Sequence, residues 1–502
     1  MIKNDFLNQV KILLKGKVFT NSAWGIFSNL FQNILFSIFF IVLARKYNTS
    51  DFANYILANT LYGFVVAFSS LGLGQWFIRM LLETDDKQAL VYKFFKIQIL
   101  IGLLFYVINI VLTYSIYDSV VIRHLSLLIG INVIFDNIIY VIKFLNIAEL
   151  EQKKSFIILT IEAVLKFFVA CLLFITYIPI IYLSIILIFL RFITLNIFIR
   201  WGTTNKIQLV QILKVKLNIE EVKKIVLANW SFIVIGSISV VYWRIGNILI
   251  SKLLTLNDVA NYEISYKLFS MAEILPFIVS TSIFPLFIKT LKKSKSITYK
   301  LYKKAFFAYS AYGLFVFTFI FSFSDSLIPI LFGQKYSGTP FYCKEMFLTI
   351  LIFPTALLQA NLLIAMKQEK MDMWFNAVSL LINVIISVIG LYFFKSLIVV
   401  NYAIFFSFLI FHLLQDVLLA IRKITKPTHA LMFYLITSIV VLVYYLLAQW
   451  FNTFFLFFIF WFCIAVLFAI VYFKLYLKNT KSIVSLETID LKPELSDTNS
   501  KY

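Results

Sequence analysis

DFANY at residues 51–55 and DVANY at residues 258–262 are nearly the same pentapeptide, repeated 207 residues apart in a chain of 502. The same offset matches Arg45, upstream of the first copy, with Lys252, upstream of the second. It also places the first three long apolar segments on the seventh, eighth and ninth. We therefore expect an internal duplication.

The composition is that of an integral membrane protein: 62% of the residues are hydrophobic and only 14% are charged. A helix needs roughly 20 apolar residues to cross a hydrocarbon core of about 30 Å. The sequence contains fourteen such segments, so we expect an all-α polytopic fold of about 14 transmembrane helices. They start near Ser22, Ala53, Lys93, Ser119, Ser155, Ile178, Lys224, Val259, Ala305, Pro340, Met371, Leu397, Ala430 and Asn452.

The net charge of +21 arises from basic clusters between these segments, which indicate topology rather than nucleic-acid binding. With the N-terminus in the cytoplasm, the inner segments carry 34 Lys and Arg residues and the outer segments carry six. This asymmetry predicts that both termini are cytoplasmic. The three cysteines are scattered singly, so we expect neither disulfides nor a metal site.

Six spans in each half return the chain to the side where it started, so the repeat should be parallel, with a central cavity between the halves. We predict an N-terminal six-helix lobe over residues 1–200, an interfacial linker over 201–223 and a C-terminal six-helix lobe over 224–425. An additional helix pair over 426–478 and a disordered cytoplasmic tail over 479–502 follow.

The segment YWRIGNILISKLLTLNDVANYEISYKLFSMAEILPFIVSTSIFP, residues 242–285, resembles the corresponding region of bacterial polysaccharide repeat-unit flippases. These Wzx-type O-antigen and capsule exporters belong to the multidrug/oligosaccharidyl-lipid/polysaccharide (MOP, MATE-like) superfamily. The resemblance extends to LARKYNTSDFANYILANTLYGFVVAFSSLGLGQWFIR, residues 43–79, and covers about residues 10–420. Many relatives have an acid two places after the position of Arg244, where this chain has Gly246.

This resemblance implies alternating access to a central cationic cavity. The implied function is a non-enzymatic flippase that carries undecaprenyl-diphosphate-linked oligosaccharide across the bacterial plasma membrane, without a cofactor. A proton or sodium ion, membrane lipid and other polysaccharide assembly proteins are the partners to expect. A MATE-like drug or ion antiporter is the main alternative, because it shares the architecture. A membrane polymerase or glycosyltransferase fits less well, because the longest outer loop is near eight residues.

Arg244 lies within an apolar span, and its position has two interpretations. An arginine near a helix centre costs about 2.5–3.5 kcal/mol on insertion scales, so it usually contacts protein, water or a ligand. It also lies only seven residues before Ser251, so its side chain could snorkel to the interface. Ser237 and Asn247 share its helical face, which favours a cavity. Because Gly246 replaces the acid of many relatives, we expect Arg244 to lack a local neutraliser.

The other candidates for substrate binding are cationic or polar. Ser37 is the repeat equivalent of Arg244, and Asn33 lies one turn before it. Lys267 matches a basic position of the family pattern, although Glu263, four residues earlier, could simply pair with it. These matches suggest that function is concentrated in the second half. Arg191, near the middle of the sixth span, is a further cavity candidate.

Several acidic residues, and two arginines at the ends of spans, are the remaining candidate functional residues. Asp136 is the best lone carboxylate for ion coupling, and Glu263 and Glu273 are further coupling candidates. Arg45 and Arg79 lie at span ends, where they serve as anchors or gates. Two pairs of ionisable residues lie four positions apart, one helical turn, and have simpler interpretations. Glu162 and Lys166 are expected to neutralise each other. His412 and Asp416 are expected to form an interfacial pair near the cytoplasmic end of their span.

Overall fold

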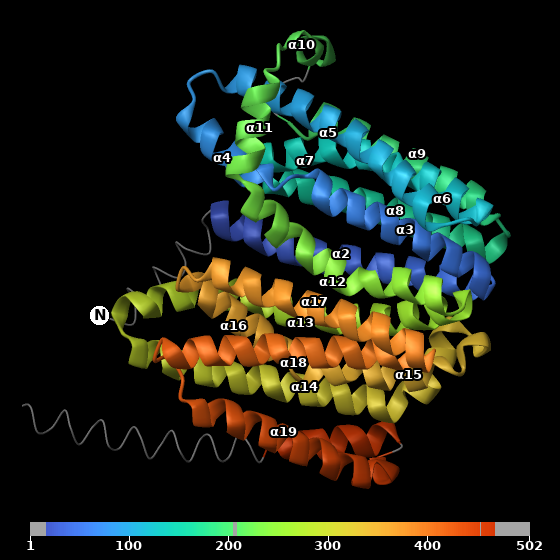
Figure 1. Cartoon of the computed structure of the whole chain (residues 1–502), viewed down its shortest axis with the longest axis vertical. Helices are drawn as coiled ribbons and strands as arrows, with labels where there is room; N and C mark the ends of the chain where they lie inside the picture. The colour runs from blue at the N-terminus through green and yellow to red at the C-terminus, as the bar shows by residue number, and fades with distance from the viewer. Residues whose placement is uncertain (1–16, 204–207, 452, 467–502) are drawn as a thin grey trace, which may run out of the picture. The chain divides into compact units, whose positions relative to one another are not determined.

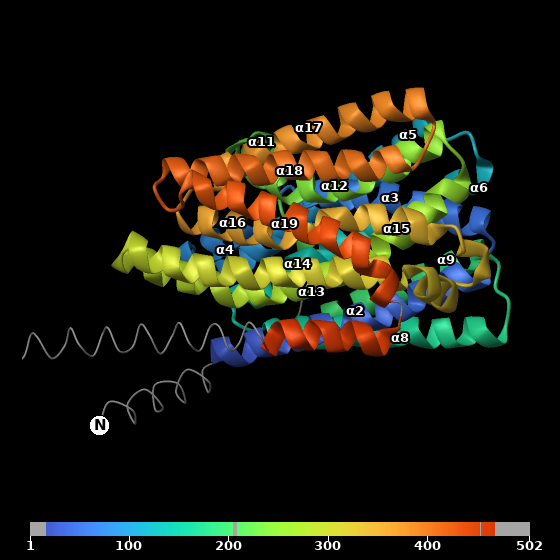
Figure 2. The ribbon, with the colours of Figure 1, turned by 90° about the horizontal axis from the view of Figure 1, so that it is seen from below.

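The computed structural model describes residues 17–203, 208–451 and 453–466, and these residues form helices and short connections without a β-strand. The chain divides into two compact units, Met1–Thr437 and Ser438–Tyr502. Within the first unit, the long helices of both halves run side by side along a common direction (Figures 1 and 2). The predicted all-α polytopic membrane fold is confirmed.

Over the described residues 17–203, the first half has eight helices, because two of its spans are interrupted. They are α2 (Lys17–Lys46), α3 (Thr49–Ser69), α4 (Leu73–Glu83), α5 (Lys87–Ile116), α6 (Val120–Gly130), α7 (Asn132–Ala148), α8 (Gln152–Ile175) and α9 (Ile180–Trp201). The break between α3 and α4 has Leu71 and Gly72 in the left-handed region, at φ of 48° and 61°. Two short helices follow in the linker, α10 (Leu209–Lys214) and α11 (Ile219–Ala228).

The second half has the corresponding arrangement. Its elements are α12 (Trp230–Leu253), α13 (Leu256–Lys293), α14 (Lys295–Phe332), η1 (Gln334–Tyr336), α15 (Thr339–Met346), η2 (Phe347–Leu351), α16 (Phe353–Ala365), α17 (Glu369–Phe394) and α18 (Ile398–Ile421). The chain continues through α19 (Pro427–Leu447), η3 (Ala448–Phe451) and the apolar helix Phe454–Val466.

Twelve helical segments among the described residues are long and apolar enough to cross a membrane, and each matches a predicted span. The predicted seventh span coincides with α12, whose 24 residues extend about 36 Å at 1.5 Å per residue. The fourteenth coincides with the shorter helix Phe454–Val466. The predicted tail over 479–502 lies outside the described residues, and the proposed domain boundaries remain predictions.

The two halves use the same helix pairings. α2 contacts α8 as α12 contacts α17, and α3 contacts α6 as α13 contacts α15. Likewise, α5 packs against α7 as α14 packs against α16, and α8 against α9 as α17 against α18. These matched pairings follow the order of the spans along each half, as the parallel repeat predicted.

The repeated pentapeptide begins the second span of each half. The Asn48 side chain accepts a hydrogen bond from the Asp51 backbone N–H at the start of α3. Thr255 and Asp258 form a reciprocal capping box at the start of α13. Side-chain acceptors of this kind satisfy backbone N–H groups that a helix start leaves unpaired. The aspartate of DxANY therefore has a structural role in fixing where the second span starts.

Candidate functional site

An ionic network fills part of the first lobe. Arg191 on α9 donates from Nε to Asp136 Oδ1 on α7 at 2.8 Å and also pairs with Glu162 on α8. Glu162 additionally pairs with Lys166, one helical turn later, at 2.8 Å. The Tyr62 hydroxyl on α3 donates to Asp136. Two cations and two carboxylates from three helices thus form a charge-balanced cluster, consistent with the need to pair charges within a membrane-spanning bundle.

This network borders a cavity of about 320 Å³ inside the first lobe. Lys166 and Arg191 supply its cations, and the Lys166 ammonium lies 5.1 Å from the centre of the Phe36 ring. Most of the remaining lining is amide, hydroxyl or apolar. The lining residues are Gln32, Phe36, Tyr55, Asn59, Tyr62, Ile129, Asn132, Leu159, Glu162, Lys166, Ser184, Leu187 and Arg191.

Two predictions about this lobe need correction. Asp136 is not a lone carboxylate, because Arg191 and Tyr62 both bind it. Glu162 and Lys166 do pair, but Arg191 joins them, so they do not form a private pair. Arg191 lines this cavity inside the first lobe, whereas the sequence led us to expect a central cavity between the halves. Reasoning over i and i+4 positions missed these contacts, because the partners lie on different helices.

The second charged cluster lies beside α3, where the two lobes meet. Arg244 on α12 pairs with Glu263 Oε1 on α13 at 2.6 Å, and its guanidinium lies 4.9 Å from the Tyr266 ring centre. Asn247 donates to Glu263 Oε2 at 2.9 Å and to the Thr60 hydroxyl of the first lobe at 3.1 Å. The polar side chains predicted on α12 thus bind both α13 and the first lobe.

The expectation that Arg244 lacks a neutraliser is wrong. Glu263 supplies the missing acid from the next helix. A Cβ at position 246 would lie 2.7 Å from the Tyr262 hydroxyl oxygen, so glycine makes room for this tyrosine. The private Glu263–Lys267 pair does not form among the described residues either. Lys267 instead places its ammonium 5.5 Å from the centre of the Phe40 ring, across the lobe boundary.

The remaining candidates lie apart from these clusters. Ser37 is buried and Asn33 donates to the Asn29 carbonyl at 2.8 Å; neither is among the residues that line the first-lobe cavity. Glu273 is buried, and its Oε1 has no hydrogen-bond partner among the described residues. Arg79 is exposed in the second half of α4.

Arg45 belongs to a seam that joins the lobes on the predicted outer side. Its guanidinium donates to the Ile330 carbonyl at 3.0 Å, while Lys335 donates back to the Arg45 carbonyl at 3.2 Å. Tyr117 bonds Ser251 at 2.9 Å. Burial raises the pKa of Tyr117 to about 12, so its hydroxyl stays protonated.

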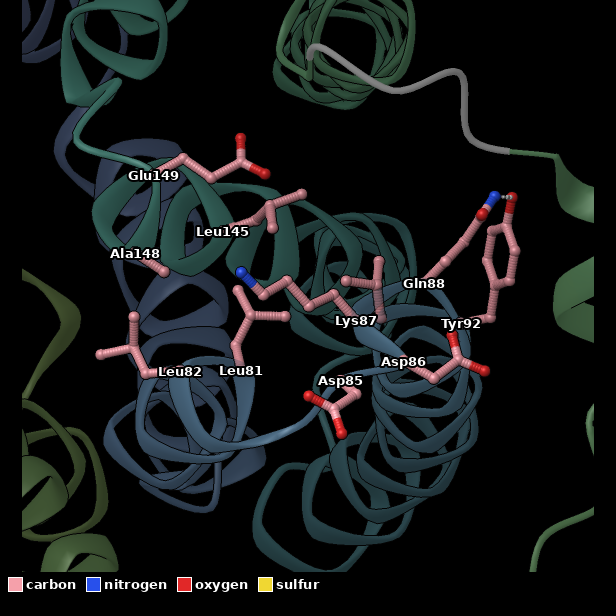
Figure 3. A pocket seen from close by; sticks show the side chains of 11 residues that line it. Leu81, Leu82, Asp85, Asp86, Lys87, Gln88, Tyr92, Leu145, Ala148 and Glu149 are labelled. Carbon is pink, nitrogen blue, oxygen red and sulfur yellow. Dashed lines mark hydrogen bonds between the residues drawn. The ribbon is translucent and has the colours of Figure 1, made fainter.

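A pocket of about 350 Å³ lies where α4 ends, at the predicted cytoplasmic side (Figure 3). Lys87 extends into it, and Gln88 donates to the Tyr92 hydroxyl at its rim at 3.1 Å. Burial and the nearby Glu151 raise the pKa of Glu149, which also lines it. The pocket includes three carboxylates and one lysine, so an anionic ligand is disfavoured there. Its lining is Leu81, Leu82, Asp85, Asp86, Lys87, Gln88, Val91, Tyr92, Leu145, Ala148 and Glu149.

The family model described as polysaccharide biosynthesis protein matches residues 18–291, which include the first-lobe network, Arg244 and Lys267. The chain belongs to the polysaccharide biosynthesis protein family. No curated protein matches the chain. The family assignment agrees with the resemblance to repeat-unit flippases.

Solved structures of three transporters resemble this chain in fold. An inward-facing multidrug resistance MATE family transporter of the MOP superfamily has a TM-score of 0.64 at 10% identity, covering 79% of this chain and 96% of that one. The lipid II flippase MurJ, in an inward closed conformation, has a TM-score of 0.60 at 15% identity, covering 84% and 92%. A MOP superfamily transporter from Pyrococcus furiosus has a TM-score of 0.54 at 12% identity, covering 82% and 97%. The chain therefore has a MOP-type transporter fold.

Proposed function

We propose that the protein flips undecaprenyl-diphosphate-linked oligosaccharide units from the cytoplasmic to the outer leaflet of the bacterial inner membrane. The observation that carries this proposal is the first-lobe cavity lined by Arg191 and Lys166, in a member of the polysaccharide biosynthesis family. Guanidinium groups bind phosphate oxygens through paired, charge-assisted hydrogen bonds. A lipid-linked diphosphate is thus a suitable ligand for this cavity.

The charge balance of the cavity sets a condition on binding. Arg191 already bonds Asp136 and Glu162 through Nε and both terminal nitrogens, so a diphosphate competes with these carboxylates for the guanidinium. A displaced carboxylate in a low-dielectric site is costly unless a proton or cation neutralises it. This exchange gives a physical reason to expect coupling to a proton or sodium ion. Asp136 is the carboxylate that we assign to it, with Glu263 and Glu273 as further candidates.

The contacts between the lobes suggest the state of the transport cycle. The Arg45, Lys335 and Tyr117 bonds join the lobes at the predicted outer end, with both termini in the cytoplasm. Farther from that end, α2 leaves Phe27 and Ile34 exposed, at 63% and 57%. We interpret this arrangement as closed to the outside. Arg45 then acts as part of an outer gate.

The membrane potential is one source of energy. Moving one charge through 100 mV is worth about 2.3 kcal/mol, so a dianion leaving an inside-negative cell gains about 4.6 kcal/mol. Nucleotide hydrolysis is not required for such a step.

The decisive experiment reconstitutes the full chain in liposomes and follows a lipid-linked oligosaccharide diphosphate from one leaflet to the other. We expect flipping by the unaltered protein, near-complete loss in Arg191→Gln and a strong reduction in Arg244→Gln. Lys292→Gln, which changes an exposed lysine at the end of α13, is the matched control and should leave flipping unchanged.

Two results would overturn the proposal. Unchanged flipping in Arg191→Gln would remove the first-lobe cavity from the mechanism. Transport of small organic cations against a proton or sodium gradient, with no movement of the lipid-linked substrate, would instead establish the MATE-like antiporter function.

A further inference from the structure

Two helical hairpins that reach the predicted cytoplasmic side end in opposite charges. The hairpin of α13 and α14 carries seven lysines between Lys289 and Lys304, and no acidic residue occurs from position 274 to position 324. The hairpin of α4 and α5 instead turns through three acids, Glu83, Asp85 and Asp86. We call residues 289–304 the basic end and residues 83–86 the acidic end.

The two ends occupy equivalent places in the duplicated fold. The offset of 207 between the DxANY copies maps residues 83–87 onto residues 290–294, where α13 ends and α14 begins. α13 and α14 have 38 residues each, about 57 Å at 1.5 Å per residue, and α3 with α4 covers 35 residues. These lengths exceed a hydrocarbon core of about 30 Å, so both hairpins extend beyond the membrane on the same side.

Membrane topology does not account for the acidic end. The positive-inside rule favours lysine and arginine on the cytoplasmic side, so it predicts a basic end in both halves. Among residues 83–87 the only cation is Lys87, and its side chain extends into the pocket of the first lobe (Figure 3). The inverted charge at one of two equivalent places therefore needs another explanation.

The charges at both ends lack ion-pair partners in the part of the chain that the structure describes. Glu83 and Asp85 are exposed, and Arg79, one turn before Glu83, pairs with neither of them. Lys289 and Lys293 are exposed as well, and neither pairs with an acid. Both ends are therefore available for new contacts.

A charged pair inside the second lobe shows the contrast. His412 and Asp416 are buried, and His412 Nδ1 lies 3.1 Å from Asp416 Oδ2. This pair is buried rather than interfacial, contrary to the expectation from its place near a span end. Its partners lie within one lobe, so it needs no contact with the other.

The two hairpins belong to spans that meet at one side and diverge toward the cytoplasm. α3 packs against both α12 and α13, whereas α4, which continues the same span, packs against α5 and α7 of its own lobe. Figures 1 and 2 place the end of α4 and the α13–α14 hairpin at the same end of the bundle, in different lobes. In a parallel repeat, a two-fold axis along the membrane normal relates such equivalent ends, so they face each other across it.

We propose that the acidic end and the basic end form ion pairs across the lobe boundary when the protein opens to the outside, and so act as an inner gate. The partner of the basic end is thus the first lobe of the same chain. This inference rests on the alternating access of the proposed function. In the structure the outer seam is formed and the two ends are unpaired, as expected for the opposite state of the cycle.

The charge inversion has a physical consequence for closure. If both ends were basic, closing the cytoplasmic side would bring like charges together, and their repulsion would oppose it. An acidic end opposite a basic end attracts it instead, and each exposed ion pair adds a small stabilisation that salt screens. Several such pairs shift a two-state equilibrium without locking it.

The separation of the two ends can be measured by double electron–electron resonance on the full chain in lipid nanodiscs. Spin labels are attached to Leu82→Cys and Ser296→Cys, both exposed positions. The native Cys171, Cys343 and Cys463 are replaced by alanine in this background. We expect a longer and a shorter population of distances, and 0.5 M KCl should reduce the shorter one several-fold because salt screens exposed charges.

Charge reversal tests the cause of the shorter population. Lys289→Glu/Lys293→Glu should reduce it on the order of tenfold, because two attractions become repulsions. Adding Glu83→Lys/Asp85→Lys should restore it.

The matched control is Lys370→Glu/Lys426→Glu, which makes the same change of charge at two exposed lysines of the second lobe outside the basic end. It should leave the shorter population within twofold. Neutralising one of the seven lysines, as in Lys292→Gln, should also change it by less than twofold.

The measurement is repeated in Arg45→Gln, which loses a bond of the outer seam and should increase the shorter population. A single long distance in both proteins, or a shorter population that survives charge reversal, would overturn the gate. The readout does not require transport. If the protein proves to be an antiporter, the charge dependence still tests the gate; normal flipping with a charge-independent distance would reject the gate alone.

Discussion

The interiors of the two lobes differ although their helix pairings correspond. In the first lobe, Arg191, Asp136 and Glu162 meet beside a cavity. In the second, the space among α12, α13, α16 and α18 is filled by aromatic rings. Trp243 lies 5.1 Å from Phe269 and 5.8 Å from Phe408, between ring centres. The duplicated helix pairings are thus compatible with a polar interior in one half and a packed aromatic interior in the other.

This difference leads to a prediction opposite to the expectation that function is concentrated in the second half. That idea rested on Arg244 and Lys267, whose repeat equivalents, Ser37 and Thr60, are uncharged. Arg244 is held by Glu263 at the lobe boundary, while the cavity with two cations lies in the first lobe. The first half should therefore contribute most to substrate binding, and the second should contribute rigidity and the contact across the boundary.

Arg191→Gln tests the polar interior and should have the largest effect. It leaves Asp136 without its guanidinium in a membrane-spanning bundle, which should destabilise the fold by about 3–5 kcal/mol. Thermal unfolding in detergent micelles measures this loss. The double variant Arg191→Gln/Asp136→Asn keeps the Lys166–Glu162 pair and removes the unpaired charge, so it should recover stability but not flipping. Equal instability in the double variant would contradict the ionic explanation.

Trp243→Ala tests the aromatic interior. Removing this buried ring should lower the free energy of unfolding by about 3 kcal/mol, because it leaves a cavity among its neighbours. Flipping per folded molecule should remain within about twofold of the unaltered protein, since truncating a packed ring removes contacts rather than a charge. Trp243→Phe is the control and should lose about half as much stability. If flipping disappears while the protein remains folded, the second interior is not merely structural.

Thr60→Val tests the bond that connects the two halves. Valine keeps the shape of threonine but cannot accept the hydrogen bond from Asn247, which spans 3.1 Å between the lobes. We expect a loss of about 1 kcal/mol in unfolding free energy, typical of one buried hydrogen bond. Thr60→Ser retains the hydroxyl and should lose less. The same loss in both variants would show that the methyl group, not the bond, matters.

Glu149→Gln examines a carboxylate of the first lobe outside the spans and should have the smallest effect. Because burial raises the folded-state pKa of Glu149, its ionisation disfavours the folded state as pH rises through the usual carboxyl range. Glutamine should therefore stabilise the protein near neutral pH and not in acid, by less than about 1 kcal/mol because much of the Glu149 side chain still contacts solvent. Unfolding temperatures at the two pH values measure the difference; an equal gain at both would exclude titration as its cause.

Much of the fold was predictable because its signals are local. Apolar length places the spans, and twelve of the predicted segments match described helices of sufficient length. The DxANY repeat revealed the duplication because both helix starts use the same local bond: the backbone N–H of Asp51 or Asp258 donates to the side chain three residues earlier, Asn48 or Thr255. These signals depend on neighbouring residues, so a single sequence contains them.

The site was less predictable because its contacts join separate helices. Asp136 and Arg191 are 55 residues apart, and Arg244 and Glu263 are 19 apart. Helical spacing compares only residues on one helix, so it paired Glu263 with Lys267 and left Asp136 alone. Tyr62 was missed altogether, since a tyrosine in an apolar span carries no distinguishing pattern. Many tyrosines of this chain look the same in sequence.

The sequence alone determined that this is a duplicated helical membrane protein, because hydrophobic length and helix capping are set by adjacent residues. It also contained the cations and acids from which the networks are built. Only the tertiary structure decided their partners: Arg191 with Asp136 and Glu162, Arg244 with Glu263, and His412 with Asp416 and Tyr434. The physical reason is that a charge in a membrane-spanning bundle takes the nearest partner that packing provides, and packing brings together helices that are distant in sequence.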